Sequence, residues 1–478
     1  MLLKSIKIAT IAILLMNVTG FAQETAYRIE VQIDKFQGKV CYLGYPYGPK
    51  KYLADTAEIN GDGRFIFEGT KPLDGGLYFV YSPAPESLYF DLIVAESEFS
   101  VATDTLDLIA HMKTEGSKEN EAFFNFQRFM RDKQKQGNEL SEQLKAASNQ
   151  EEKDNLTAQL KELDTEVKSY RSELFEKYPD TFAASFIRST VSIDVPESPK
   201  DANGEDADPN FAYKYYKEHY FDNIDFSDKK MLRTPNFHGK IEDYLEKMTV
   251  KHPDSIISSA HTIIDKARAN DEIFRYCVVH ITSKYETSNI MGMDAVFVDL
   301  SESYYLSGDA FWADSALTAK ISDRVSRLKP NLIGNQAPMM ILVDTSMQPA
   351  SLYSLQADYF VLYFYDPDCG HCKKKTPILK ELYDSKLKNM GVKVVATNIK
   401  KDVNKWKKYI KEQEMDWINL ADPNVRSNFR YEYNLETTPI IYVLDDQKKI
   451  IAKKLDVDQI EEFINKQIEL KAKNQSAG

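Results

Sequence analysis

Two cysteines spaced as C-x-x-C carry the most evident chemistry in this sequence. Cys369 and Cys372 follow the apolar run Tyr359–Tyr365, which predicts a buried strand, and they precede a segment with the composition of a helix. A C-x-x-C at a helix start brings two sulfur atoms within bonding distance, and the first lies among free backbone N–H groups that favour its thiolate form. Because the thiolate is the form that attacks disulfides, we expect Cys369 to be the nucleophile. The more buried Cys372 should resolve the mixed disulfide.

The residues beside the cysteines should tune this reactivity. Asp368 stands immediately before Cys369, and its charge opposes thiolate formation. The helix dipole and a protonated His371 favour the thiolate, and the sequence leaves this balance open. Three lysines at positions 373–375 could steer acidic substrates, although an ordinary solvated helix face is the simpler interpretation.

Two other uses of the C-x-x-C pair compete with redox chemistry. Zinc usually takes four ligands, often from two such pairs, but the sequence has no second pair and its other histidines are scattered. Alternatively, a domain that has lost its redox activity could keep the two cysteines only as a structural disulfide. We favour the redox interpretation and expect neither a metal nor a cofactor. Cys41 and Cys277 are most simply buried apolar thiols, although a disulfide between them is compatible with an oxidising compartment.

Residues 331–473 contain the elements that must position the cysteine pair. Short apolar runs alternate there with amphipathic segments, which is the pattern of an α/β fold. Strands are expected at Met340–Asp344, Asp358–Tyr365, Val392–Ile399, Ile440–Leu444 and Lys449–Leu455. Helices are expected at Cys369–Met390, Val403–Glu414 and Val457–Leu470.

This segment resembles the thioredoxin superfamily, and most closely the envelope thiol–disulfide oxidoreductases of the TlpA/ResA type. The resemblance rests on the strand before the C-x-x-C, on Pro377 five residues after Cys372, and on Thr438-Pro439 before a strand. In that family a proline kinks the helix at the position of Pro377. A cis-proline loop at the position of Thr438 and Pro439 lies beside the cysteines and pairs with the substrate backbone. The extra length at 401–422 is similar to an insertion in TlpA-like members.

The resemblance implies an enzyme that exchanges disulfides with protein substrates, as a reductase or an isomerase, together with a redox partner that the sequence does not identify. The dipeptide Gly370-His371 is similar to that of protein disulfide isomerases and implies a pair less reducing than the Gly-Pro of thioredoxin. Thioredoxins often have a buried acid six residues before the first cysteine, and this chain has Tyr363 there.

Two other functions stand as alternatives. The first is a thiol peroxidase, because peroxiredoxins have a related fold. Their P-x-x-x-T-x-x-C pattern is incomplete here, since Pro367 lies two residues before Cys369 and the threonine is missing. The second is an envelope binding or scaffold protein that uses the thioredoxin-like domain for docking, because the regions before that domain make up about two thirds of the chain.

Two accessory regions should precede the thioredoxin-like domain. Residues 24–105 contain short alternating segments such as Arg28–Ile33 and predict a small β-sandwich. Residues 106–330 are predicted to be mainly α-helical, since residues 118–178 are rich in helix-forming types with almost no Gly or Pro. Further helices are expected at Ile241–Val250, Ser255–Arg268 and Asp309–Lys329, and a loop at Val195–Asn210. The predicted fold class is therefore multidomain: an N-terminal β-sandwich, an α-helical middle region and a C-terminal α/β thioredoxin-like fold.

Residues 1–22 have the features of a signal peptide. Lys4 and Lys7 precede the apolar run Ile8–Met16, and small residues end at Ala22. We therefore expect cleavage after Ala22 and a periplasmic protein without a stable membrane span, because the run is too short to anchor the chain. The net charge of −12, with no concentrated basic stripe, argues against nucleic-acid binding.

Overall fold

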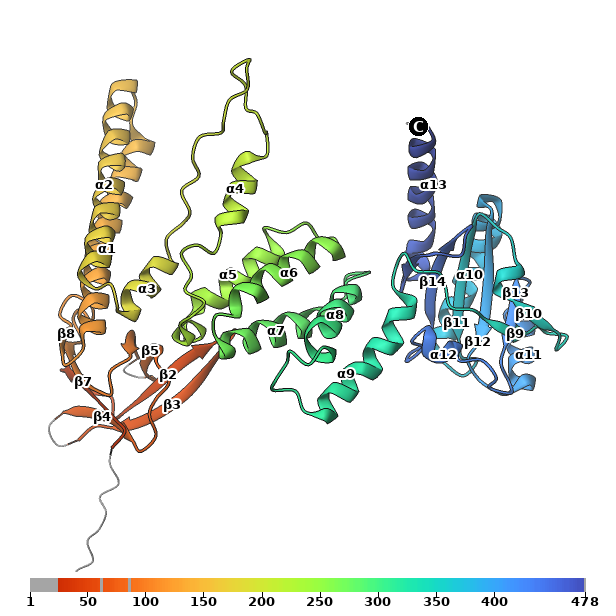
Figure 1. Cartoon of the computed structure of the whole chain (residues 1–478), viewed down its shortest axis with the longest axis horizontal. Coiled ribbons are helices and arrows are strands. Elements are labelled where there is room, and N and C mark those ends of the chain that lie inside the picture. The colour runs from red at the N-terminus through yellow and green to blue at the C-terminus, as the bar shows by residue number, and fades with distance from the viewer. Residues whose placement is uncertain (1–24, 61–62, 85–86, 477–478) are drawn as a thin grey trace, which may run out of the picture. The chain divides into compact units, whose positions relative to one another are not determined.

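The computed structural model describes residues 25–60, 63–84 and 87–476. The chain forms two compact units, residues 1–239 and 240–478, and the boundary falls within helix α5 (Pro235–Glu246) (Figure 1). The expected signal peptide lies outside the described residues. Within the described ranges, no helix combines the length and the apolar character needed to cross a bilayer.

The first unit begins with two four-stranded sheets. Their strand orders are β4-β1-β7-β8 and β3-β2-β5-β6. The strands are β1 (Tyr27–Asp34), β2 (Val40–Tyr47), β3 (Lys50–Glu58), β4 (Arg64–Gly69), β5 (Gly76–Ser82), β6 (Leu88–Val94), β7 (Glu98–Asp104) and β8 (Lys113–Glu115). Both sheets contribute to one core, which includes Ile29, Leu43, Phe65 and Val80. The predicted β-sandwich is confirmed, because alternating residues place their apolar side chains on one face of each strand.

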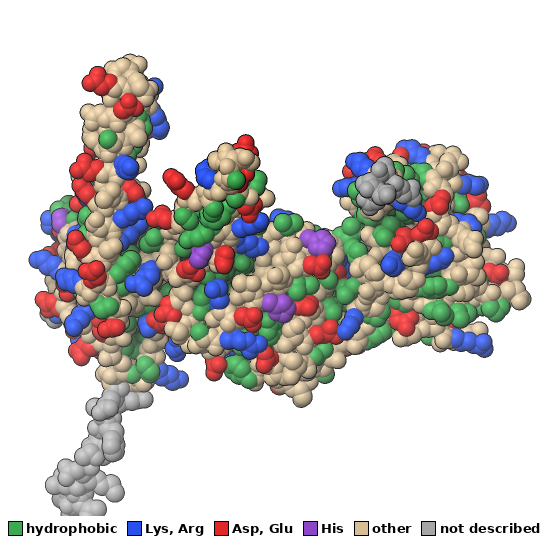
Figure 2. Space-filling model, turned by 45° about the horizontal axis from the view of Figure 1, so that its top comes forward, with side chains coloured by type: hydrophobic (Ala, Val, Ile, Leu, Met, Phe, Trp, Pro, Cys, Tyr) green, Lys and Arg blue, Asp and Glu red, His purple; other side chains and the backbone are tan. Residues whose placement is uncertain are grey.

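Two long helices follow the sandwich as an antiparallel hairpin. They are α1 (Lys118–Ala146) and α2 (Gln150–Lys177). Residues 147–149 separate them, and Asn149 caps α2 by accepting a hydrogen bond from the N–H of Glu152. The rings of Phe129 and Tyr170 stack between the helices, with centroids 3.8 Å apart. Charged side chains of both signs cover the visible surface of the hairpin (Figure 2), as expected for solvated helix faces.

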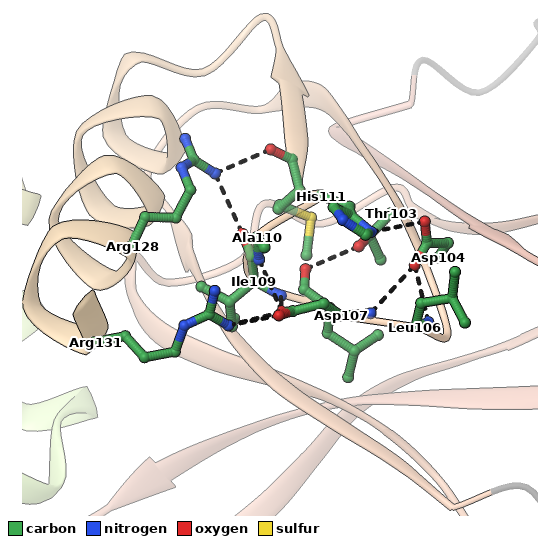
Figure 3. Close-up of polar contacts among 11 residues, drawn as sticks. Thr103, Asp104, Leu106, Asp107, Ile109, Ala110, His111, Arg128 and Arg131 are labelled. Atoms are coloured by element: carbon green, nitrogen blue, oxygen red, sulfur yellow. Dashed lines mark hydrogen bonds and ion pairs between the residues drawn. The ribbon is translucent and has the colours of Figure 1, made fainter. Parts of the chain in front are cut away.

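The loop between β7 and β8 ties the sandwich to α1 (Figure 3). Asp107 in the loop accepts hydrogen bonds from Arg131 of α1 at 2.7 and 2.9 Å. Arg128, one turn earlier, donates to two carbonyl groups of the same loop. Asp104 lies 2.8 Å from the ring nitrogen Nδ1 of His111. Each carboxylate here already has hydrogen-bond partners within the loop or on α1, so we assign the cluster a structural role.

Shorter helices complete the helical region. They are α3 (Phe182–Ser189) and α4 (Phe211–His219) in the first unit, and α6 (Pro253–Ala267), α7 (Asp271–Glu286), α8 (Asp294–Leu300) and α9 (Ser315–Leu328) in the second, with a π-helical turn η2 (Ser301–Leu306) after α8. The helix expected at Asp309–Lys329 was predicted too long. It begins at Ser315, because Asp314 accepts a hydrogen bond from the N–H of Leu317 at 2.7 Å and caps the first turn. The helix expected at Ile241–Val250 is α5, which starts earlier, at Pro235, a residue suited to a first turn.

A partly buried cluster of ion pairs and hydrogen bonds joins α5 and α7 within the second unit. Glu242 lies 2.7 Å from His280 Nε2 and 2.7 Å from Lys284 Nζ. The hydrogen bond from His280, together with the Lys284 charge, outweighs burial and lowers the pKa of Glu242 to about 2. A carboxyl group whose pKa is lower in the folded than in the unfolded chain stabilises the fold above its unfolded pKa and loses that contribution as the pH falls.

We expect Glu242→Gln to lower the free energy of unfolding by about 2 kcal/mol at pH 7. The difference from the wild type should shrink as the pH falls from about 4.5, the ordinary Glu value, towards 2, because Glu242 then becomes protonated in both the folded and the unfolded chain. Urea unfolding at several pH values measures this difference. A difference that does not change with pH would show that ionisation of Glu242 is not its cause.

A seven-stranded mixed sheet forms the C-terminal part of the second unit (Figure 1). Its order is β10-β9-β13-β12-β11-β14-β15. The strands are β9 (Ile341–Val343), β10 (Pro349–Ser351), β11 (Tyr359–Tyr365), β12 (Val392–Asn398), β13 (Ile418–Ala421), β14 (Ile440–Asp445) and β15 (Ile450–Lys453). The central strand β11 pairs in parallel with β12 and antiparallel with β14. Every residue of β11 is buried, as expected for a strand covered on both faces.

Helices cover both faces of this sheet. On the face that carries Val361 and Tyr363, helices α10 (Gly370–Ser385), α11 (Val403–Glu412) and α13 (Ile460–Ser476) contribute to the core. The short helix α12 (Phe429–Glu432) packs on the opposite face through Phe429. The predicted thioredoxin-like α/β fold is confirmed. Three short elements, β10, β13 and α12, were not predicted, because three or four residues carry too little periodic pattern to identify.

The two isolated cysteines are buried free thiols, as predicted. Cys41 lies in the core of the β-sandwich and Cys277 within α7. Burial raises the pKa of both, that of Cys41 to about 12. Neither thiol is therefore poised for reaction.

Candidate functional site

The cysteine pair follows the end of strand β11 and lies at the N-terminus of α10. Cys369 occupies the N-cap position, and its Sγ lies 3.4 Å from the backbone nitrogen of Cys372. The sulfur therefore takes the place of a capping oxygen and satisfies a free N–H of the first turn. The predicted placement between strand and helix is confirmed, and Pro377 lies inside α10 as the resemblance implied.

The loop before β14 brings Thr438 and Pro439 close to Cys369. The Sγ of Cys369, which is partly exposed, lies 3.3 Å from the carbonyl oxygen of Thr438, and the Thr438–Pro439 peptide bond is cis. Burial raises the pKa of Cys369. Hydrogen bonding to the side chain of Thr438 and to the backbone N–H groups of Cys372 and His371 outweighs this effect, so the pKa is lower than that of an ordinary thiol.

Cys372 has the opposite character. It is fully buried, and burial raises its pKa to about 12. Tyr363, Tyr365 and Trp406 belong to the core cluster that surrounds it. The two sulfurs therefore differ, since Cys369 is partly exposed and has a lowered pKa, whereas Cys372 is buried and has a raised pKa.

A network of hydroxyl groups occupies the place where thioredoxins often have a buried acid. Thr376 donates its single hydroxyl proton to the carbonyl oxygen of Cys372 at 2.8 Å. The hydroxyls of Tyr363 and Tyr409, each 2.8 Å from Thr376 Oγ1, must therefore donate to Thr376. These three hydroxyls are therefore linked to one another and to the backbone of Cys372.

Two lysines compensate the acids that precede Cys369. Lys405 Nζ lies 2.9 Å from Asp368 Oδ2, and Lys400 Nζ lies 3.2 Å from Asp366 Oδ2. The hydrogen bond from Lys405 lowers the pKa of Asp368. Sequence reasoning left the effect of Asp368 open and identified neither lysine, because nothing in the sequence distinguishes them from their neighbours. With its charge compensated, Asp368 opposes the Cys369 thiolate less than the sequence suggested.

The pKa of Cys369 should therefore depend on Lys405. Lys405→Ala leaves the charge of Asp368 uncompensated beside the sulfur, so the pKa of Cys369 should rise. We expect the pH profile of Cys369 alkylation by iodoacetamide to move to higher pH in Lys405→Ala and to lower pH in Asp368→Asn. The double variant should lie close to the wild type. If the pH profile of alkylation in Lys405→Ala matched that of the wild type, solvent would already screen the ion pair between Lys405 and Asp368.

The remaining predicted site residues lie at the open surface. Gly370 and His371 are exposed in the first turn of α10, and a methyl group added at Gly370 would meet no heavy atom within 4 Å. The approach to Cys369 is thus open rather than enclosed. Such a surface suits an extended protein segment better than a small molecule that must be surrounded.

Comparison with known proteins matches three parts of the chain to family models. The AhpC/TSA family matches residues 333–453. Two domains of unknown function, DUF4369 and DUF5106, match residues 27–123 and 148–331.

The relatives concern mainly the C-terminal part. A thiol-disulfide oxidoreductase ResA of Bacillus cereus is 24% identical over 121 residues, which is 25% of this chain and 68% of the relative. Among solved structures, a domain of a possible thiol-disulfide isomerase from Cytophaga hutchinsonii has 35% identity and covers 30% of this chain and 97% of its own, with a TM-score of 0.28. A thioredoxin-like protein from Bacteroides caccae has 21% identity and covers 57% of this chain and 98% of its own, with a TM-score of 0.45.

Proposed function

We propose that this chain, whose residues 333–453 form a thioredoxin-like domain of the AhpC/TSA family, exchanges disulfides with protein substrates through Cys369 and Cys372. The relatives named as thiol-disulfide oxidoreductases support this proposal. The observation that carries the assignment of roles is the difference between the two sulfurs. Cys369 is accessible with a lowered pKa, whereas Cys372 is buried with a raised one.

The proposed reaction transfers two electrons from the cysteine pair to a substrate cystine. The Cys369 thiolate attacks one sulfur of the cystine, which forms a mixed disulfide and releases the other substrate sulfur as a thiolate that takes up a proton. Cys372 then attacks Sγ of Cys369. This step forms the Cys369–Cys372 disulfide, and the proton of Cys372 passes to the second departing substrate sulfur. A dithiol reductant restores the starting state, and the reverse sequence oxidises a substrate.

Thr438 and Pro439 are proposed to bind the substrate backbone beside the nucleophile. The proximity of Thr438 to Cys369 Sγ supports this role. We propose Gly370, His371 and Asp368 as residues that tune the pair, and a reductase or isomerase as the direction of use. The protein is proposed to act in the cell envelope after export and cleavage of residues 1–22, with the β-sandwich (24–105) and the helical region (106–330) as accessory domains before the catalytic domain (331–473).

Reduction of insulin tests this function. Full-length protein reduced with dithiothreitol should accelerate the cleavage of insulin disulfides above the rate with dithiothreitol alone. The same preparation should not consume hydrogen peroxide, because the pattern of the thiol peroxidases is incomplete here. Peroxide consumption without insulin reduction would instead favour the peroxidase. A protein without either activity that still binds envelope proteins would favour the scaffold function.

A further inference from the structure

Lysines are concentrated in two segments, residues 373–374 just after the cysteine pair and residues 400–411, whose Lys400 and Lys405 contact the acids before Cys369. We call them the lysine rim, and its members are Lys373, Lys374, Lys400, Lys401, Lys405, Lys407, Lys408 and Lys411. Residues 400–411 contain six of these lysines and a single acid, Asp402. Lys373 lies in the first turn of α10 and Lys405 in the first turn of α11, where the helix dipole disfavours positive charge. Helix stability therefore does not account for lysines at these positions.

Side-chain contacts bring both segments to the nucleophile. Lys405 and Lys400 reach Asp368 and Asp366, the acids just before Cys369. The charges of Lys373 and Lys400 also act on Asp368. The first turn of α10 and the segment that leads into α11 thus converge on the residue adjacent to the attacking sulfur.

Most of the rim has no compensating charge. Lys373, Lys374, Lys401, Lys407 and Lys411 are all exposed, and none of them has a carboxylate oxygen within 4.0 Å among the residues described. By contrast, the neighbouring Lys375 pairs with Asp456 at 2.5 Å.

Positive and negative side chains are unevenly distributed in the C-terminal domain. Residues 331–478 carry 22 basic and 20 acidic side chains. The eight rim lysines and the four acids next to them or paired with them, at 366, 368, 402 and 412, give a local charge of +4, and the other residues of this segment sum to −2. A positive surface around the nucleophile is therefore a local feature of a protein whose net charge is −12.

We propose that the lysine rim is the docking surface for a negatively charged segment of the substrate protein, next to the cystine that Cys369 attacks. This inference rests on the proposed function and specifies its substrate class. Opposite charge speeds encounter and aligns the bound segment, and the effect weakens with salt because exposed charges are screened. The rim thus selects among cystines by the residues that flank them, while the open site accepts any cystine that fits.

Two cystine peptides test the proposal. They share one disulfide loop and differ only in flanking residues, which are Asp and Glu in one peptide and Lys in the other, and a third peptide with Ser flanks reports basal turnover. With reduced full-length wild type at low ionic strength, kcat/KM for the acidic peptide should exceed that for the basic peptide by about tenfold or more. The ratio should approach one in about 0.5 M salt, a concentration chosen to screen these charges.

A charge-reversal variant locates the effect. Lys374→Glu/Lys401→Glu should reduce the ratio strongly or invert it. The matched control Lys388→Glu/Lys393→Glu has the same net charge, but its lysines lie at the opposite end of the sheet, because Val392 pairs with the start of β11 and Cys369 follows its end. The control should keep the wild-type ratio. Using a ratio cancels any change in the pKa of Cys369.

The outcomes separate this proposal from the proposed function. Equal turnover of the acidic and basic peptides by the wild type at low salt would overturn the docking surface but leave the oxidoreductase in place. An equal loss of preference in both variants would assign the effect to net charge and overturn the role of the rim. If the wild type turned over none of the three peptides, the proposed function itself would fail.

Discussion

Replacing Cys369 by Ser should abolish insulin reduction, with a loss of at least about 10³-fold relative to the wild type. A serine hydroxyl can cap α10 as the sulfur does, so we expect the fold to persist. It cannot form a thiolate, however, and therefore cannot attack a cystine. Insulin turbidity with dithiothreitol as the reductant measures the loss, and urea unfolding of the same variant verifies that it is folded. Activity close to that of the wild type would refute the assignment of Cys369 as the nucleophile.

Cys372→Ala provides the matched variant, because it removes only the resolving thiol. Attack by Cys369 should still occur, but the mixed disulfide should then persist. Non-reducing electrophoresis and mass spectrometry should show substrate linked to Cys369, and the same trap identifies physiological partners. If Cys372→Ala linked no substrate while the wild type reduced insulin, the proposed order of attack would be wrong.

Asp294→Ala should destabilise the second unit by about 3–5 kcal/mol. Lys453 in β15 is almost completely buried, with 3% of its side chain exposed, and its Nζ pairs with Asp294 of α8. Nζ also donates to the carbonyl oxygen of Asn331 at 2.9 Å. Burial lowers the pKa of Lys453 and the Asp294 charge opposes that effect. Removing Asp294 therefore leaves a buried ammonium group without its counter-charge.

Urea unfolding measures the effect, and a double variant is the control. Asp294→Leu/Lys453→Met removes both charges and should lose much less stability than Asp294→Ala, because apolar residues can replace a buried ion pair at little cost. Equal losses in the two variants would show that the unpaired charge is not the cause. A fragment that begins at residue 331 would lack Asp294 and would therefore leave the buried Lys453 without its counter-charge, at the same cost in stability.

The sequence by itself was sufficient to predict the elements that hold the redox pair. The apolar run at 359–365 is short and aromatic, which favours a strand buried on both faces, and the C-x-x-C that follows it is typical of a helix start. The alternation in residues 24–105 likewise predicted the sandwich. These signals are local, since each depends on side chains a few positions apart along the chain. Elements of three or four residues, such as β10 and α12, escaped prediction because they carry no repeating pattern.

Only the tertiary structure decided which charges meet. Asp368 and Lys405 lie 37 positions apart, and Asp294 and Lys453 lie 159 apart, so no local pattern could reveal either pair. The hydroxyl network of Tyr363, Thr376 and Tyr409 likewise depends on the packing of β11, α10 and α11 against one another. The identity of the reactive residues is thus encoded in short-range sequence. Their charge environment depends on contacts between distant segments, because electrostatic interactions follow distance in space rather than along the chain.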